Sequence, residues 1–341
     1  MSNLNVCFLP HLEGIGGPSS FEAKLKKGLE SQGIEVHYDP IRPGLSVLLV
    51  VGGTSRVLEI SRARHRGVRI VQRLDGINWL HKLAPTGLRH YLRAEWNNWL
   101  LATIRSALAD HIVYQSSFTQ DWWQTHNKTP RASSEVIYNG IDLNEFSPVG
   151  EEKPPQKRIR ILVIEGSFKG GHDRDLLNAV QFAKSLQAKS MIKVELMVAG
   201  KVPEKLARQV TEYAPDLVNW LGLIPHADIP ALDRSAHMLF PAEINAACPN
   251  SVVEALACGL PVICYATGSL PELVQGDAGR VMPYGTNYWN LEPPNPADLI
   301  QGAIEILANQ SHFRQAARAR AEKYFGLELM TQKYIDALKL R

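Results

Sequence analysis

The sequence predicts an α/β protein made of two doubly wound domains, each with a parallel sheet between two layers of helices. Three observations lead to this prediction. Short apolar runs of strand length alternate with helical segments, most runs end in turn residues, and a polar, proline-rich stretch at 146–158 interrupts the alternation once. Strand, turn and helix at this spacing are typical of parallel sheets. A chain of 341 residues is long enough for two domains of about 150–180 residues each.

The first predicted domain covers residues 1–148. Its apolar runs are expected to be strands at Val6–Leu9, Glu35–His37, Val47–Val51, Arg69–Gln72, His111–Tyr114 and Val136–Tyr138. A helix is expected at Ser20–Ser31, after the glycine-rich loop that follows the first run. Ligands of such sheets bind beyond the carboxyl ends of the strands.

The second predicted domain covers 159–316, after a linker at 149–158. Its expected strands are Ile159–Ile164, Val194–Ala199, Leu217–Leu221, His237–Phe240, Pro261–Cys264 and Gly279–Met282. The remaining residues, 317–341, have a helical composition.

Composition narrows the class of protein. The content is 45% apolar and 21% charged, with a net charge of +3, as in a globular protein outside the membrane and without a nucleic-acid partner. The four cysteines have no metal-ligand spacing, so we expect buried, reduced thiols and a cytoplasmic location. The amino-terminal residues do not resemble a signal peptide, and no apolar run approaches the roughly 20 residues that span a bilayer.

The most informative stretch is Pro241–Leu273. It predicts a turn and a short helix that starts near Ser251, with Gly259 after its last residue as helix ends favour. A buried strand and a second loop and helix follow, at Thr267–Glu272. Two helix amino termini side by side at one sheet edge would favour a phosphorylated ligand.

Residues 249–273 also resemble the signature of the retaining family 4 glycosyltransferases, and a weaker resemblance continues over most of the chain. The resemblance implies the GT-B fold, in which two Rossmann-like domains face each other across a cleft and the carboxyl-terminal helix crosses back to the first domain. It also implies a metal-independent enzyme of polysaccharide biosynthesis without a cofactor. Its partners would be a nucleotide-diphospho-sugar donor and a glycan or lipid-linked acceptor. A peripheral contact with the inner face of the membrane is a further expectation.

The resemblance assigns the donor phosphates to two glycine-rich loops. Gly16 and Gly17 match a loop that faces the phosphates in the family, and glycine lets a ligand approach the backbone closely. Gly166, Lys169 and Gly170 match a second loop, where amides and one ammonium suit a diphosphate. Lys169 is therefore the predicted catalytic cation, although the arginine usual in this loop is absent. An ordinary turn and a surface lysine are the alternatives.

Glu254 has two interpretations. The sequence Ser251-Val252-Val253-Glu254 matches a capping box, in which Glu254 would bond back to the Ser251 amide. In the family the matching glutamate binds the ribose hydroxyls of the nucleotide, and a carboxylate accepts two hydroxyl donors well. Asn250, Ser251 and the Gly268 backbone complete the predicted donor-binding residues.

One position departs from the family. The acid that holds the transferred sugar lies eight residues before the ribose glutamate, and here that position is Ala246. Glu243 and Asn245 are near but out of register. The departure leaves a non-catalytic partner that binds sugar nucleotides in a glycan assembly complex as one alternative. A nucleotide-sugar epimerase of the same architecture is another, although no convincing acid–base pair is evident.

Three further groups have open interpretations. Gly222, Leu223 and Ile224 match the loop that packs on the nucleobase, and Asp75 is a candidate catalytic residue that would orient acceptor or sugar; ordinary turns explain both equally well. Asp173 and Asp175 form a DxD pattern that we interpret as the start of a helix.

Two groups of surface candidates remain. A basic cluster between Arg56 and Arg73 is either a solvated helix face or a contact for an anionic membrane or an acceptor. Trp96 and Trp99 share one helical face, where we expect core packing, with membrane or sugar-acceptor contact as the alternative.

Overall fold

The computed structural model describes the chain outside a few short gaps. The described residues are 4–12, 14, 16–84, 87–169 and 173–339. The chain divides into two compact units. Unit 1 comprises residues 1–81, 86–140 and 326–341, and unit 2 comprises residues 82–85 and 141–325.

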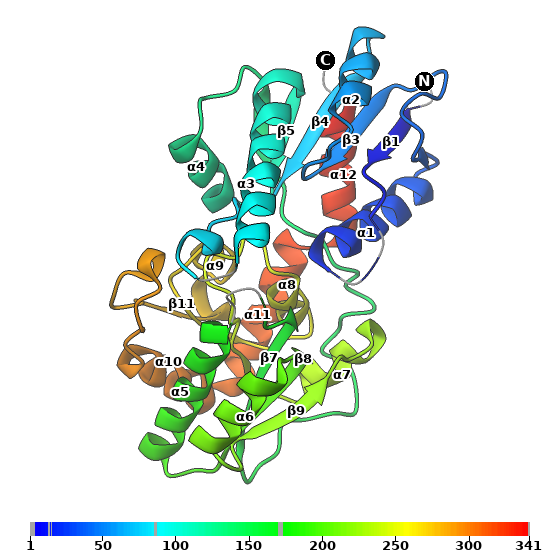
Figure 1. Ribbon diagram of the computed structural model, residues 1–341. Helices are drawn as coiled ribbons and strands as arrows, with labels where there is room; N and C mark the ends of the chain where they lie inside the picture. The colour runs from blue at the N-terminus through cyan, green and yellow to red at the C-terminus, as the bar shows by residue number, and fades with distance from the viewer. Residues whose placement is uncertain (1–3, 13, 15, 85–86, 170–172, 340–341) are drawn as a thin grey trace. The chain divides into compact units, whose positions relative to one another are not determined.

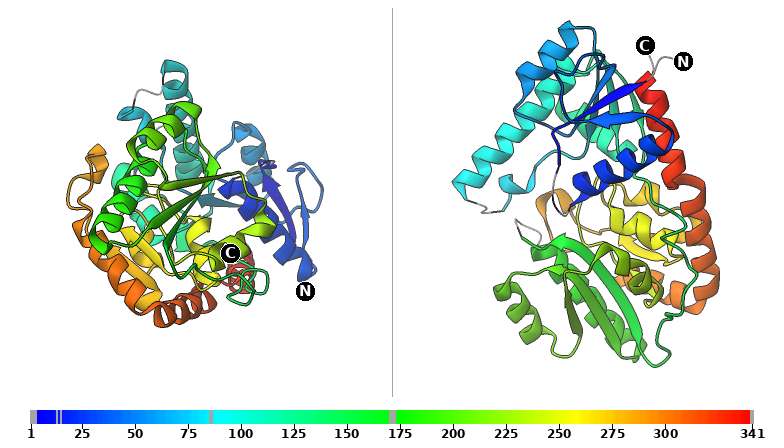
Figure 2. Two further views of the ribbon diagram at one scale, coloured as in Figure 1. Left: turned by 90° about the horizontal axis from the view of Figure 1, so that it is seen from below. Right: turned by 90° about the vertical axis from the view of Figure 1, so that its right-hand side faces the viewer.

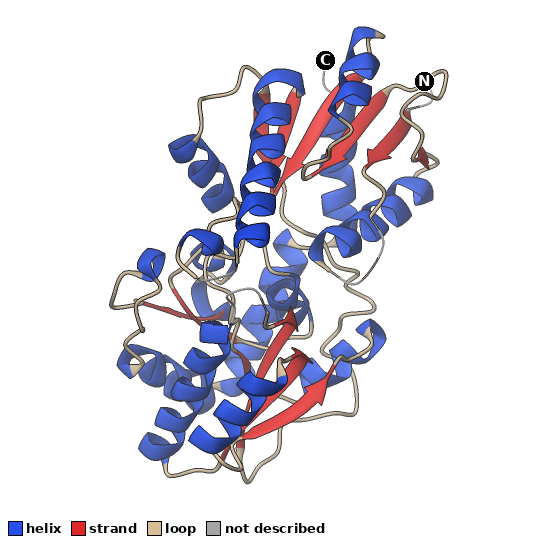
Figure 3. Ribbon diagram, in the orientation of Figure 1, coloured by secondary structure: helices blue, strands red, loops and turns tan. Residues whose placement is uncertain are grey.

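Unit 1 contains a parallel sheet with the strand order β2-β1-β3-β4-β5-β6. The strands are β1 (Asn5–Leu9), β2 (Glu35–His37), β3 (Val47–Val51), β4 (Arg69–Leu74), β5 (His111–Tyr114) and β6 (Ser133–Val136). The helices are α1 (Gly17–Ser31), α2 (Val57–His65), α3 (Leu88–Thr103), α4 (Ser117–His126) and α12 (Leu327–Lys339). Strands and helices alternate along the chain, as Figure 3 shows.

Alternate residues of each strand in unit 1 face opposite layers of helices. On one face Phe8 and Leu49 pack with α1 and α12, which lie side by side in Figures 1 and 2. On the other face Cys7, Leu48 and Ile60 form a second core with α2. Both faces of the strands are buried, which explains why they appear in the sequence as continuous apolar runs.

Unit 2 repeats the plan with the strand order β12-β11-β10-β7-β8-β9, again parallel. Its strands are β7 (Ile159–Ser167), β8 (Val194–Lys201), β9 (Val218–Gly222), β10 (Met238–Leu239), β11 (Val262–Tyr265) and β12 (Gly279–Met282). Its α-helices are α5 (Asp173–Ser190), α6 (Glu204–Tyr213), α7 (Ile229–Arg234), α8 (Asn250–Ala257), α9 (Leu270–Leu273), α10 (Ala297–Ala308) and α11 (Gln310–Tyr324).

Each sheet has a point where the chain reverses the direction in which it adds strands. In unit 1 this point lies between β1 and β3, and in unit 2 between β7 and β10. The helices on either side of such a point cover opposite faces, which leaves a crevice beyond the carboxyl ends of the two strands. The loops that follow β1, β7 and β10 are therefore the places where each unit is expected to bind a ligand.

The predicted α/β fold with two parallel, doubly wound sheets is confirmed. The strand predicted at Val136–Tyr138 is wrong, because the sixth strand is Ser133–Val136. It lies at the sheet edge and carries exposed serines, so it lacks the apolar signal of a buried strand. The cysteines are buried free thiols, as predicted. Within the described residues, no helix is both long and apolar enough to cross a bilayer.

Candidate functional site

The candidate site of unit 2 is built from loops at the carboxyl edge of its sheet. The loop after β7 starts at Phe168, the loop after β10 leads to Asn250 at the start of α8, and the loop after β11 contains Gly268. Strands β7, β10 and β11 are neighbours in the sheet and run in the same direction. The predicted donor-binding residues therefore lie on adjacent loops of one sheet edge.

Lys169 lies on a loop whose first residue, Phe168, is anchored to the rest of unit 2. The Phe168 side chain is buried, and its backbone N–H donates to the Lys201 carbonyl at 3.1 Å. Lys169 itself is exposed. The sequence placed Gly166 in the loop after β7, and this prediction is wrong, because Gly166 lies inside β7. A side chain at Gly166 would meet nothing within 4 Å, so the protein's own packing does not require this glycine. Gly170 lies outside the described residues.

Glu254 is not part of a capping box. Helix α8 begins at Asn250 after the N-cap Pro249, which puts Ser251 inside the first turn, and the N-cap makes no side-chain bond. The Glu254 carboxylate is 7% exposed and accepts a hydrogen bond from His226 Nε2 at 3.0 Å. The carboxylate therefore reaches away from its own helix. The binding of ribose stays a prediction.

The sequence did not indicate His226 as a residue of the candidate site. Its ring packs on Phe146 with 5.0 Å between the centroids, and its Nδ1 lies 4.0 Å from Glu145. It lies two residues after Ile224, the last residue of the predicted nucleobase loop. That loop leaves β9 at Gly222, which has φ +67°, and exposes Leu223, whereas Ile224 is half-buried. The exposed apolar side chain is available for stacking, and the base contact stays a prediction.

The second predicted helix amino terminus is weaker than expected. Helix α9 is a single turn of four residues, so its dipole is small and α8 is the better anion site. The preceding loop is packed tightly against the loop after β10. A Cβ at Gly268 would lie 2.7 Å from the backbone N and O of Ala246, and the Ser269 amide donates to the Ala246 carbonyl at 3.0 Å.

This contact predicts a large stability effect for Gly268→Ala. The residue has φ +56°, which costs a non-glycine residue about 1–2 kcal/mol, and the Ala246 backbone cannot yield as a side chain could. We expect the free energy of unfolding to fall by about 2–4 kcal/mol in chemical denaturation. Gly276→Ala is the matched control, because Gly276 has φ +61° and open space around it. Equal losses in both variants would contradict the steric account.

Two polar side chains beside Gly268 are buried without partners. Within the described residues, neither side-chain amide atom of Asn245 nor Ser269 Oγ makes a hydrogen bond. Asn245 is 4% exposed and Ser269 is 0% exposed. An unpaired buried polar group costs about 1–3 kcal/mol, and groups of this kind call for a ligand or a water. Asn245 adopts φ +61°, a conformation that no pattern in the sequence indicated.

A second carboxyl group, that of Asp233, interacts electrostatically with Glu254. Asp233 on α7 is fully buried, and this desolvation, together with the Glu254 charge, raises the pKa of Asp233 well above its ordinary value. The folded state therefore keeps a proton that the unfolded chain releases above about pH 3.9. Stability consequently falls as the pH rises from that value toward the folded-state pKa.

Asp233→Asn should remove this decline. We expect the melting temperature of the variant to exceed that of the wild type by a margin that grows with pH above about pH 4. Melting curves over a pH series check this result. Asp228→Asn is the control, since Asp228 is exposed. Parallel pH profiles of wild type and Asp233→Asn would contradict the assignment.

In unit 1, the predicted residues lie at its own carboxyl edge. Gly16 and Gly17 are exposed at the start of α1, and a Cβ at either position would meet nothing within 4 Å. Asp75 follows β4, and its backbone carbonyl accepts a hydrogen bond from Trp123 Nε1 at 2.7 Å. Burial raises the pKa of Asp75, whereas the nearby Arg73 charge lowers it. The catalytic role of Asp75 stays a prediction.

Three other groups differ in outcome. Asp173 and Asp175 begin α5, as predicted. In the basic cluster, Arg62, Arg64, His65 and Arg66 are exposed, as expected for a solvated helix face, whereas Arg73 is buried. Contact of the cluster with a membrane or an acceptor stays a prediction. Core packing of Trp96 and Trp99 is wrong, because both are more than half exposed.

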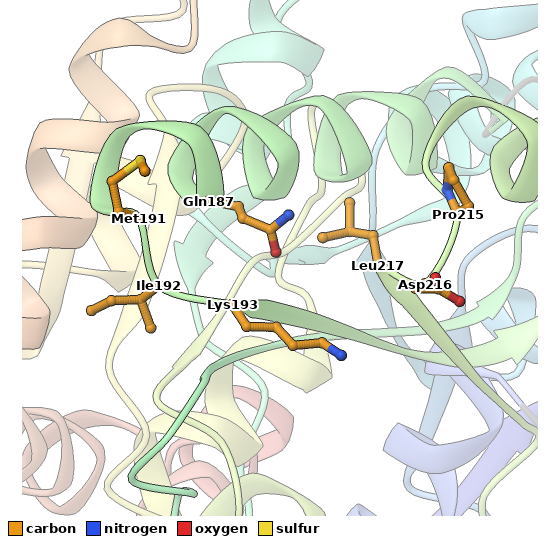
Figure 4. A pocket seen from close by; sticks show the side chains of 7 residues that line it. All are labelled: Gln187, Met191, Ile192, Lys193, Pro215, Asp216 and Leu217. Atoms are coloured by element: carbon orange, nitrogen blue, oxygen red, sulfur yellow. The ribbon is translucent and has the colours of Figure 1, made fainter.

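A pocket of about 470 Å³ lies elsewhere in unit 2 (Figure 4). It is lined by Gln187, Met191, Ile192, Lys193, Pro215, Asp216 and Leu217. These residues precede β8 and β9, so the pocket opens at the amino ends of these strands. It is separate from the candidate donor site at their carboxyl ends.

Two family models match the chain. Residues 161–324 match the Glycosyl transferases group 1 model, and residues 51–145 match the Glycosyltransferase Family 4 model. Together these matches span about three quarters of the sequence.

Individual proteins are similar over parts or all of the chain. O-antigen chain mannosyltransferase B of Escherichia coli is 32% identical over 126 residues, which are 36% of this chain and 30% of that protein. The chain thus aligns with under a third of this curated relative. Among solved structures, sucrose-phosphate synthase from Thermosynechococcus elongatus has a TM-score of 0.75 at 15% identity, with 98% of both chains covered. Anabaena HepE in complex with UDP and glucose has a TM-score of 0.68 at 17% identity, with 98% and 99% covered.

Proposed function

The chain belongs to the group 1 glycosyl transferases of family 4, and we propose that it is a retaining, metal-independent glycosyltransferase. It would move a sugar from a nucleotide-diphospho-sugar to a glycan or lipid-linked acceptor in polysaccharide biosynthesis. The proposal includes a cytoplasmic location, with peripheral contact at the inner face of the membrane. The observation that carries it is the gathering of Lys169, the first turn of α8 and Glu254 at the reversal point of unit 2.

Each of these elements would act on one part of the donor. Amides in the first turn of α8 and the Lys169 ammonium would stabilise the negative charge that grows on the departing diphosphate. Glu254 would accept hydrogen bonds from the ribose hydroxyls. The HepE structure supports the assignment of a nucleotide donor, since that protein was crystallised with UDP and glucose. The mannosyltransferase relative supports an acceptor in surface polysaccharide synthesis.

We further propose that Asn245 and Ser269 supply neutral hydrogen-bonding groups to the donor sugar, where the family has an acid. Asn245→Ala should then raise the KM for the nucleotide-sugar about two- to twelvefold, since one lost hydrogen bond is worth about 0.5–1.5 kcal/mol. The affinity for the free nucleoside diphosphate should stay unchanged. An equal loss for both ligands would contradict contact with the sugar.

A thermal-shift panel of UDP, GDP, ADP and dTDP with their sugars tests the donor class. A ligand at about 100 times its dissociation constant should stabilise the protein by about 2.7 kcal/mol. We expect one nucleobase to stand out, with a larger shift for its sugar conjugate. No shift with any nucleotide would contradict the proposal.

Ala246 favours a second candidate function, that of a non-catalytic partner that binds sugar nucleotides. Its backbone supports the Gly268 loop, and its position lacks the family acid. A protein that binds a nucleotide-sugar but transfers nothing, even as Ala246→Glu, would favour this second function.

A further inference from the structure

Helix α3 carries an apolar stripe on the face opposite the one that packs in the core. The stripe consists of Leu88, Leu92, Trp96 and Trp99, which are 75%, 60%, 54% and 53% exposed. Their spacing of four, four and three residues aligns them along one side of the helix. The core side is formed by Ala94 and Leu101, both 6% exposed. The helix therefore has two apolar faces, and unit 1 needs only one of them.

The two tryptophans of the stripe form a preassembled aromatic surface. The Trp96 and Trp99 rings are stacked, with 4.9 Å between the centroids and 24° between the planes. Tyr91 of the same helix is 41% exposed. Exposed apolar side chains that gather on one helix mark a surface for binding, in contrast to single scattered ones.

The charge beside the stripe identifies what binds there. Arg89 and Arg93 are exposed, one turn apart, and follow the stripe residues Leu88 and Leu92. Within the described part of the chain, neither makes an ion pair or a hydrogen bond. The one acid of α3, Glu95, contacts His81 with 2.6 Å between Oε1 and Nε2. The stripe is thus apolar and aromatic with a positive edge.

We propose that the apolar stripe of α3 docks on the surface of an anionic lipid bilayer. Leucine and tryptophan side chains would enter the boundary between head groups and acyl chains, and Arg89 and Arg93 would meet lipid phosphates. A second copy of the chain fits less well, because it would bring the same arginines to the contact. A sugar acceptor also fits less well, because Leu88 and Leu92 offer a hydroxyl no hydrogen bond. The inference deepens the proposed membrane contact but does not rest on catalysis.

Co-sedimentation of the full chain with lipid vesicles tests the proposal. One vesicle is phosphatidylcholine alone, and in the other about a third of the lipid is phosphatidylglycerol. We expect at least about tenfold stronger partition to the anionic vesicles, weakened by added salt. The double variant Trp96→Ala/Trp99→Ala should lose about tenfold or more of this partition. Arg89→Ala/Arg93→Ala should bind both vesicles alike and weakly.

Two further variants separate docking from folding and from other contacts. Leu58→Ala removes an apolar side chain that is 73% exposed on α2 and should bind vesicles like the wild type. Trp96→Phe/Trp99→Phe should still bind, but should lose the blue shift of tryptophan emission that vesicles cause in the wild type. All variants should melt at the wild-type temperature, since the altered side chains are exposed.

Three outcomes would overturn the proposal. One is no binding of the wild type to anionic vesicles, and another is undiminished binding of Trp96→Ala/Trp99→Ala. The third is a dimer in solution that this variant abolishes, which would make a second copy the occupant. Because the assay contains no donor and no acceptor, these outcomes are independent of the transferase proposal.

Discussion

Replacing Lys169 by alanine is expected to lower turnover about a hundred- to a thousand-fold, the cost of removing one group that stabilises charge in a transition state. Lys169 is exposed on the loop after β7, and the buried Phe168 anchors that loop. The ammonium would neutralise charge on the leaving diphosphate, which is larger in the transition state than in the bound donor. The loss should therefore appear in kcat more than in KM.

Lys193→Ala is the matched control for this experiment. Lys193 is an exposed lysine of the same unit, but it precedes β8 and lies at the opposite edge of the sheet. Initial rates and melting curves of both variants separate catalysis from folding. A Lys169→Ala enzyme that keeps wild-type turnover, or an equal loss in Lys193→Ala, would contradict the role of Lys169.

Replacing Glu254 by alanine is expected to weaken nucleotide binding about 10- to 100-fold. The estimate assumes a charge-assisted hydrogen bond to ribose worth about 1.5–3 kcal/mol. The carboxylate is nearly buried, and its Oε1 lies 3.0 Å from His226 Nε2. Titration calorimetry with the nucleoside diphosphate that stabilises the protein measures the effect.

A nucleotide without ribose hydroxyls makes the Glu254 test specific. With the 2′,3′-dideoxy nucleotide, wild type and Glu254→Ala should bind equally weakly, because the interaction is absent in both cases. His226→Ala should alter affinity less than Glu254→Ala does. If Glu254→Ala lowers the affinity for the dideoxy nucleotide as much as the affinity for the natural one, Glu254 acts through the structure of α8 and not through contact with ribose.

The sequence predicted the fold well because buried parallel strands leave a strong local signal. Val47–Val51 and His111–Tyr114 are buried on both faces and match the observed strands residue for residue. The edge strand Ser133–Val136 lacks that signal and was misplaced. Gly259 was placed correctly after α8, where it adopts φ +69°, since a helix end is also a local feature.

Features that depend on contacts between distant residues could not be predicted. The hydrogen bond between His226 and Glu254 joins positions 28 residues apart. The sequence pattern around Ser251 indicated a capping box, but the helix starts earlier, after Pro249. The unpaired Asn245 amide arises from the approach of two loops. The exposure of Trp96 and Trp99 arises because α3 has two apolar faces, whereas periodicity alone suggests one core-facing stripe.

Transfer of the sugar itself is the decisive measurement of whether the protein is a retaining, metal-independent glycosyltransferase. The purified chain is incubated with the nucleotide-sugar that stabilises it and with a lipid-linked glycan extract, in the presence of EDTA, and the product is examined by NMR. Such an enzyme should release one nucleoside diphosphate per sugar transferred, keep the anomeric configuration of the donor in the product, and be unaffected by EDTA. An inverted anomer, a requirement for metal, or an epimerised donor formed without any acceptor would contradict this function.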